Sequence, residues 1–202
     1  MYTAQLFKLY KNCVFQVTSP EESRNIKSLL GRNTKTRLIS NLPRKKNGKN
    51  LRVNRLKKKH NKFIYLARIS PEKGQHHFLE ALKNVSSPIV LDLYGPINDF
   101  HYWSKCEKLI NTLPNHVKVQ YKGPLKGDEV PLKVIEYDFL ALTSKGENFG
   151  HSIVEAMIEG LPVIISNRTP WLDLEQYRVG WNVDVRHDNS ITSAINMALS
   201  LS

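Results

Sequence analysis

Short apolar runs alternate with amphipathic segments from residue 62 to the end of the chain. KFIYLA and DFLALTS predict buried strands, and further strands are expected in PIVLDLYG, HVKVQYKG, LPVIIS and GWNVDV. The spacing of apolar residues predicts helices over 74–84, 99–113, 128–136, 150–159 and from 190 onward. Buried strands that alternate with helices predict an α/β fold, in which a mainly parallel, Rossmann-like sheet carries helices on both faces.

The beginning of the chain predicts a smaller strand–helix–strand unit. NCVFQVTS is rich in strand-forming residues, Ser19 suits a helix N-cap, and Pro20 suits the first helical position. Gly31 should end this helix, and TRLIS should form a second strand before Pro43. This is too little for a domain of its own. We therefore expect three regions, with residues 1–43 followed by a connection over 44–61 and a main domain over 62–202.

The connection is strongly basic. Ten of the nineteen residues from Arg44 to Lys62 are Lys or Arg and none is acidic, in a chain of formal net charge +12. A block of like charges repels itself and favours a solvated linker. Peripheral contact with an anionic membrane through Arg44–Lys62 is the second interpretation. Nucleic acid comes last, because no aromatic residue is interleaved with these cations.

Composition also indicates the cellular compartment in which we expect this protein. No run approaches the roughly eighteen apolar residues of a spanning helix, and Lys8 and Lys11 interrupt the N-terminus, so we infer no secretory signal. Cys13 and Cys106 are too few and too widely spaced for a disulfide framework or a thiolate metal site. We expect a cytoplasmic protein, with the inner membrane surface as an option for the basic segment.

Two cations follow the first strand of the main domain. The segment from Arg68 to Gly74 places Arg68 and Lys73 just before a helix N-terminus, where backbone N–H groups favour an anion. A guanidinium fork combined with a compact ammonium suits a diphosphate. The alternative is that both are ordinary loop charges paired with Glu72, and taken alone these residues favour it.

A second candidate site is the loop that enters the helix at Gly150. The N–H groups of Gly150, His151 and Ser152 should face outward as anion donors. Glu147 lies in the loop, and Glu155 lies about 7.5 Å further along the helix than Gly150, at ~1.5 Å per residue. Two carboxylates spaced in this way can hold hydroxyls at both ends of an extended ligand. In the alternative interpretation Glu155 is a solvated helix residue.

These residues resemble a known family. Glu147 and Glu155 form an E-x7-E pair within E-x-F-G-x4-E-A-x3-G-x-P-V, which is similar to the signature of the group 1 family of retaining, GT-B-fold glycosyltransferases. Arg68 and Lys73 fit the family's R-x4-K element, about eighty residues before the second motif. The resemblance covers residues 62–185 and implies the C-terminal, donor-binding half of a GT-B fold. Residues 12–43 are similar to the end of the acceptor-binding domain.

The resemblance implies site residues. Arg68 and Lys73 would neutralise the diphosphate of a nucleotide sugar and Glu147 would face its sugar, so these three are the expected catalytic residues. Further donor contacts are expected from Asn148, from the Phe149 and Gly150 backbone, from His151, from Glu155 to the ribose, and from the backbone near Gly123 and Leu125 to the base. No cofactor or metal is implied, because two cations and a helix N-terminus stabilise the leaving diphosphate without one.

The implied reaction transfers a sugar from a nucleotide-diphosphate sugar to an acceptor hydroxyl with retained configuration, in polysaccharide biosynthesis. Expected partners are this donor, a glycan or lipid-linked acceptor and a separate acceptor-domain chain, but no nucleic acid. Because most of the acceptor domain is missing, the chain should bind the donor better than it catalyses transfer. Alternatives are a non-catalytic nucleotide-sugar-binding remnant or split-enzyme subunit, and a nucleotide-sugar hydrolase or sugar phosphorylase of similar fold.

Three positions depart from the family pattern. Gly95-Pro96-Ile97 replaces a Gly-x-Gly-like turn, and Thr143 stands where Pro commonly precedes Ser144. Residues 167–171 stand where a Gly-rich loop is usual. We expect Trp171 in this segment to be a packing residue; the alternative is that the segment shapes a sugar pocket.

Overall fold

The computed structural model describes residues 10, 12–39, 41–42 and 61–201. The chain divides into two units, Met1–Pro43 and Arg44–Ser202. The predicted basic connection lies outside the described residues except for Asn61 and Lys62, and so does any membrane contact made through it. Within the described ranges, no helix is long and apolar enough to cross a membrane.

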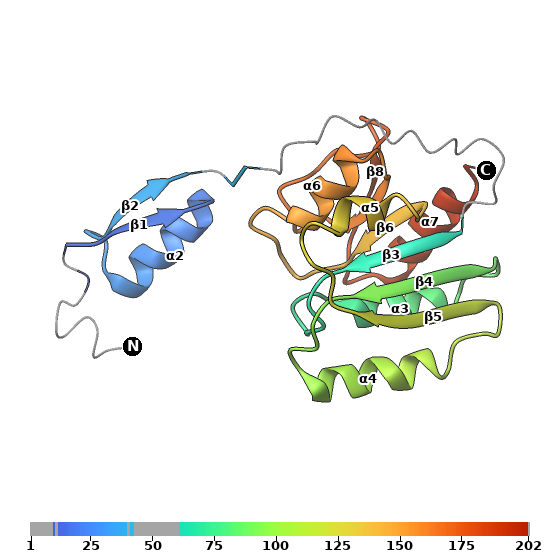
Figure 1. The fold of residues 1–202 in the computed structure, drawn as a ribbon. Coiled ribbons are helices and arrows are strands. Elements are labelled where there is room, and N and C mark those ends of the chain that lie inside the picture. The colour runs from blue at the N-terminus through green and yellow to red at the C-terminus, as the bar shows by residue number, and fades with distance from the viewer. Residues whose placement is uncertain (1–9, 11, 40, 43–60, 202) are drawn as a thin grey trace. The chain divides into compact units, whose positions relative to one another are not determined.

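The first unit is a strand–helix–strand, as predicted (Figure 1). Strand β1 (Val14–Val17) pairs in parallel with β2 (Lys35–Leu38), and α2 (Pro20–Leu30) connects them. Pro20 opens the helix, Ser19 Oγ accepts the N–H of Glu22 at 3.1 Å, and the helix ends at Leu30, as predicted. No residue of α2 is buried, so this unit holds little core of its own. Its assignment to an acceptor domain stays a prediction.

The second unit is built on a six-stranded sheet in which every neighbouring pair is parallel. The strand order is β5-β4-β3-β6-β7-β8. The strands are β3 (Lys62–Leu66), β4 (Ile89–Tyr94), β5 (Val117–Gly123), β6 (Phe139–Leu142), β7 (Val163–Ser166) and β8 (Gly180–Val183). Every residue of β6 and β7 is buried, as expected for strands covered on both faces.

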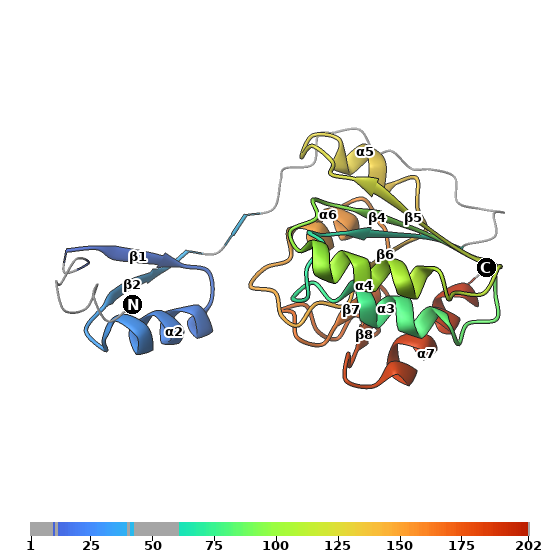
Figure 2. The ribbon, with the colours of Figure 1, turned by 90° about the horizontal axis from the view of Figure 1, so that it is seen from below.

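Helices cover both faces of this sheet, which confirms the predicted α/β architecture. Figure 2 shows α3, α4 and α7 on one face and α5 and α6 on the other. Their bounds are Gln75–Leu82 for α3, Phe100–Ile110 for α4, Val130–Val134 for α5, His151–Ile158 for α6 and Asp188–Leu199 for α7.

Several predicted boundaries were wrong. The helix expected over 128–136 is shorter, because Glu129 Oε2 and the Glu129 N–H both bond within a turn at Lys126. The last strand ends at Val183, because the Asp184 carboxylate accepts the N–H of Arg186 at 3.0 Å and turns the chain. The last helix accordingly begins two residues before Ser190.

The strand order contains a switch point. Strand β3 is the first strand of this sheet along the chain. The next two strands, β4 and β5, extend the sheet on one side of β3, and β6 begins the other side. The connections that leave β3 and β6 therefore diverge to opposite directions. Ligands of open α/β sheets bind in the crevice that such a divergence opens at the carboxyl ends of the strands.

Candidate functional site

Two loops meet at this switch point. The β3 loop (residues 67–74) carries Arg68 and Lys73, and the β6 loop (residues 143–150) carries Glu147 and Gly150. The sheet order thus brings together both motifs found in the sequence, although about eighty residues separate them.

A buried set of hydrogen bonds joins the two loops. The Tyr65 hydroxyl donates to the Lys73 carbonyl at 2.6 Å and accepts the N–H of Thr143 at 2.9 Å. Thr143 Oγ1 donates to the Gly74 carbonyl at 2.9 Å. Burial raises the pKa of Tyr65, so its hydroxyl stays neutral and keeps its proton for Lys73. Proline at position 143 would supply neither the N–H nor the hydroxyl, which explains this departure from the family pattern.

Gly74 allows the two loops to approach this closely. Its φ is 71°, and a Cβ at this position would lie 2.2 Å from the Thr143 carbonyl oxygen. A glycine is therefore required for two reasons. The backbone is left-handed at this position, and the neighbouring backbone leaves no space for a Cβ.

The side chains of the two motifs are also in contact. Lys73 Nζ lies 2.6 Å from Glu147 Oε1, and the two side chains are only 19% and 10% exposed. The alternative pairing of Lys73 with Glu72 is therefore wrong. Glu72 is exposed, and its pKa is lowered chiefly by the Ser70 hydroxyl. Its carbonyl accepts the N–H of Lys145, which ties the loops together a second time.

Arg68 lies at the exposed surface of the β3 loop. Its carbonyl accepts a bond from Gln75 Nε2 at 2.8 Å, and Gln75 is 1% exposed. The backbone at Arg68 is thus fixed by a buried amide, while the residue itself stays exposed.

The N-terminus of α6 opens from the β6 loop. Gly150 precedes the helix with φ 76°, and its carbonyl accepts the N–H groups of Ile153 and Val154. Within the described part of the chain, the N–H groups of Gly150, His151 and Ser152 have no acceptor. They form the positive end of the helix dipole.

The remaining predicted site residues surround this helix start or lie on the other side of the switch point. Asn148 and His151 are exposed, and Glu155 is half-buried further along α6. Gly123 ends β5, where its carbonyl accepts the N–H of Gly95 at 3.0 Å, and Leu125 follows it, partly buried. These last two residues thus lie on the β4 side of β3, opposite the β6 loop.

Sequence reasoning missed the residues that hold the site together. Tyr65 stood out only as a member of an apolar strand and Thr143 only as a departure from the family pattern, because the contact between them joins residues that are distant in sequence. Trp171 was expected to pack, and it does contact the core, but its Nε1 also donates to the Phe149 carbonyl at 2.5 Å. The available signal was its position, where the family usually has a Gly-rich loop.

This geometry can be set beside known proteins. The family described as glycosyl transferases group 1 matches residues 46–202. The chain belongs to this family. The resemblance drawn from the two motifs is therefore confirmed.

Solved structures confirm the GT-B architecture of this group 1 domain. Anabaena Alr3699/HepE in complex with UDP and glucose is 21% identical, with a TM-score of 0.74 over 98% of this chain and 58% of that one. Sucrose-phosphate synthase from Thermosynechococcus elongatus is 21% identical, with a TM-score of 0.70 over 99% of this chain and 53% of that one. The chain thus spans little more than half the length of these proteins and corresponds to the C-terminal half of the fold.

A curated relative has higher identity over a shorter stretch. Sulfoquinovosyl transferase SQD2 of Arabidopsis thaliana is 33% identical over 101 residues, which are 50% of this chain and 18% of SQD2. The chain therefore shares only a small part of that protein.

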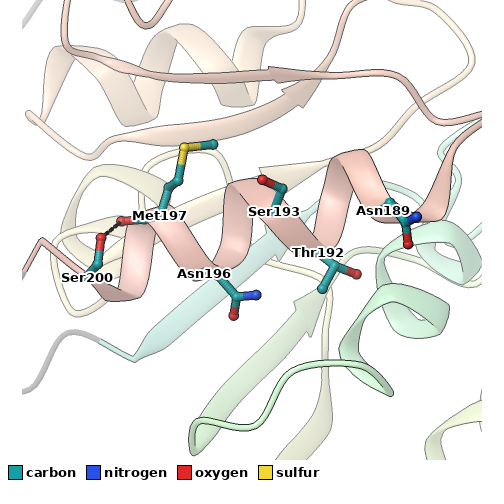
Figure 3. A pocket seen from close by; sticks show the side chains of 6 residues that line it. All are labelled: Asn189, Thr192, Ser193, Asn196, Met197 and Ser200. Atoms are coloured by element: carbon teal, nitrogen blue, oxygen red, sulfur yellow. Dashed lines mark hydrogen bonds between the residues drawn. The ribbon is translucent and has the colours of Figure 1, made fainter.

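A depression lies on α7 of the group 1 domain, and none of its lining residues belongs to either motif (Figure 3). Its volume is about 530 Å³, and it is lined by Asn189, Thr192, Ser193, Asn196, Met197 and Ser200. Five of them belong to α7, Ser200 follows it directly, and none is charged, so this depression lacks the cations that a diphosphate needs.

Proposed function

We propose that this domain binds a nucleotide-diphosphate sugar between the β3 and β6 loops. It would act as the donor side of a glycosyltransferase that moves the sugar to an acceptor hydroxyl with retention. The observation that carries this proposal is the Lys73–Glu147 contact at the switch point, in the loop that leads into α6, whose first N–H groups have no acceptor among the described residues.

The diphosphate is the part of the donor that this site suits best. A lysine ammonium has three donors, so Lys73 can keep its bond to Glu147 while it reaches a phosphate oxygen. Arg68 adds a second cation from the same loop, and the N–H groups of Gly150, His151 and Ser152 add neutral donors. Charge that develops on the leaving diphosphate would be stabilised by groups that are already in place.

The carboxylates suit the sugars at the two ends of the donor. Glu147, which contacts Lys73, would accept the hydroxyls of the transferred sugar. Glu155 would hold the ribose from α6, and backbone near Gly123 and Leu125 would lie beside the base. Asn148 and His151, both exposed at the helix start, would contribute further donor contacts.

Transfer also requires an acceptor. We propose a glycan or lipid-linked acceptor, bound by an acceptor-side half that either belongs to the same polypeptide or is a separate chain. Contact of the basic segment with anionic lipid would bring the domain to such an acceptor. If the domain binds nucleotide sugar but no such half completes it, it is a non-catalytic binding protein.

The first test is titration of the purified chain with UDP, GDP and ADP, in low and moderate salt. UDP is the natural first ligand, because the similar HepE structures contain UDP and UDP-glucose. Saturable binding with a preference for one nucleotide, retained in moderate salt, supports the proposal. Salt-sensitive binding to any polyanion without nucleotide preference would contradict it.

Substitution of Lys73 gives a sharper test. Lys73→Met should lower affinity for the preferred nucleotide by about tenfold or more, which corresponds to ~1.4 kcal/mol, because a charge-assisted bond to phosphate is lost. Lys145→Met is the matched control: Lys145 is an exposed lysine of the β6 loop, so the change in net charge is the same. Equal losses in both variants would show that general attraction, not this site, binds the nucleotide.

Substitutions of the two carboxylates should affect binding of the nucleotide and of the nucleotide sugar differently. Glu155→Ala should weaken binding of nucleotide and nucleotide sugar alike, since both contain the ribose. Glu147→Gln should weaken binding of the nucleotide sugar more than that of the bare nucleotide. Isothermal titration with both ligands measures the difference, and equal effects of Glu147→Gln on the two ligands would mean that its role is misassigned.

A further inference from the structure

The β6 loop is held from its other side by the β7 loop (residues 166–171). The Glu147 N–H donates to the Arg168 carbonyl at 3.2 Å, and Trp171 Nε1 donates to the Phe149 carbonyl at 2.5 Å. The two bonds lie at the two ends of the segment that carries the E-x-F-G motif. The β7 loop therefore braces the backbone of this motif and leaves the Glu147 carboxylate to Lys73.

The brace is itself anchored to the sheet. The Asn167 N–H donates to the Val183 carbonyl at 2.9 Å, and the Arg168 N–H donates to Ser166 Oγ, which is fully buried. Asn182 Nδ2, from the edge strand β8, donates to the Trp171 carbonyl at 2.8 Å. The position of the indole is thus set by two strands of the sheet.

The indole bond determines how one peptide is oriented. In a trans peptide the C=O and the following N–H point in opposite directions, and the described residues contain no cis bond. Because Trp171 holds the Phe149 carbonyl, the Gly150 N–H points away from Trp171. Without the bond from Trp171 this peptide could rotate, because Gly150, at a φ of 76°, has no Cβ to restrict its backbone.

We propose that Trp171 is a positioning residue of the donor site, which holds the Phe149–Gly150 peptide so that the Gly150 N–H stays available to the donor's phosphates. This inference rests on the proposed function for its ligand. A Gly-rich loop has no side-chain donor for this carbonyl, so the brace distinguishes this chain from the usual family pattern.

Packing keeps the indole in place. The Trp171 and Phe149 rings meet edge to face with centroids 5.6 Å apart, and the Phe149 ring also contacts the His151 ring, with centroids 4.9 Å apart. A phenylalanine at position 171 would retain an aromatic contact of this kind but has no N–H. The bond can therefore be removed with little change in the apolar packing.

The test compares Trp171→Phe with Trp181→Phe. Trp181 is a half-buried tryptophan of β8 that packs against Phe139, with ring centroids 6.2 Å apart, so its replacement removes the same atoms without touching the β6 loop. Affinity for UDP is measured by isothermal titration, folding by thermal unfolding, and the Gly150 amide by its ¹H–¹⁵N resonance and exchange rate.

Trp171→Phe should lower UDP affinity by about three- to tenfold, as expected for one oriented hydrogen bond, and shift the Gly150 resonance. Trp181→Phe should do neither, at a similar melting temperature.

The two readouts separate failure of this inference from failure of the proposed function. If wild type binds UDP and Trp171→Phe binds it equally well, the positioning role is wrong. If wild type does not bind any nucleotide, the proposed function fails, and the Gly150 amide then decides only whether Trp171 holds the Phe149–Gly150 peptide. An unchanged Gly150 exchange rate in Trp171→Phe overturns that role, and a changed one supports it.

Discussion

The β3 loop and the β7 loop both hold the β6 loop, but they do so by different means. The β3 loop is joined to it by buried polar groups, with Tyr65 1% exposed and Thr143 fully buried. The β7 loop reaches it through one carbonyl and one indole N–H, on a segment whose Asn167 and Arg168 are exposed. One contact is part of the core, and the other is a brace at the surface.

This difference predicts whether a substitution will lower stability or ligand affinity. A polar group left unpaired in the core bears its full desolvation cost, whereas a carbonyl near the surface can bond to water instead. Changes on the β3 side should therefore lower the stability of the whole domain. Changes on the β7 side should mainly alter ligand affinity, as expected above for Trp171→Phe.

The largest effect is expected from Gly74→Ala. The new Cβ would lie 2.2 Å from the Thr143 carbonyl oxygen at a φ of 71°, so the two loops must separate. We expect a loss of more than about 3 kcal/mol in the free energy of unfolding, from left-handed strain and overpacking together. Urea unfolding measures it.

Gly160→Ala is the matched control for that change. Gly160 has nearly the same φ, 74°, but nothing lies within 4 Å of its Cβ position. It should therefore show only the backbone strain of about 1 kcal/mol. If the two variants lose the same stability, the close approach of the two loops is not what requires Gly74.

A smaller loss is expected from Tyr65→Phe. The change leaves the Lys73 carbonyl and the Thr143 N–H without their buried partner, at a cost of about 1–3 kcal/mol. Tyr121→Phe is the control: its hydroxyl also donates to a loop carbonyl, that of Gly95, but the side chain is half-exposed. Its cost should stay below about 1 kcal/mol, because water can replace the bond. Equal losses, compared by urea unfolding, would remove the distinction between core contact and surface contact.

A further effect depends on pH and concerns His76, just after the β3 loop. Burial, followed by the charges of His77, Lys105 and Lys145, lowers the pKa of His76 from 6.5 to about 4, and its Nδ1 lies 2.8 Å from the Tyr102 hydroxyl. Between pH 6.5 and about 4, the unfolded chain therefore binds a proton at His76 that the folded chain does not bind. The stability that depends on neutral His76 is present above pH 6.5 and is lost as the pH falls toward 4.

His76→Asn should flatten this dependence. Unfolding free energies measured between pH 7 and pH 4 should fall less steeply in the variant than in wild type. His101→Asn, at an exposed position of α4, is the control. An unchanged slope in His76→Asn would show that other groups determine the acid sensitivity of this region.

Local pattern was enough to predict most of the elements. Alternating apolar runs predicted all six strands of the domain, and Ser19, Pro20 and Gly31 predicted both ends of α2, because strand burial and helix capping act over a few residues. The two motifs, with Arg68, Lys73, Glu147 and Glu155, predicted the family. Their roles toward a donor stay predictions.

The tertiary structure decided which of these residues meet. Lys73 pairs with Glu147, 74 positions away, and not with its neighbour Glu72, because the strand order puts β6 beside β3. Tyr65 and Trp171 acquired their partners in the same way, Thr143 from 78 positions away and Phe149 from 22. Sequence by itself determined the elements and which charged residues stand at the candidate site, since both depend on local residues. The geometry of the site depends on long-range pairing and close packing, which only the folded sheet determines.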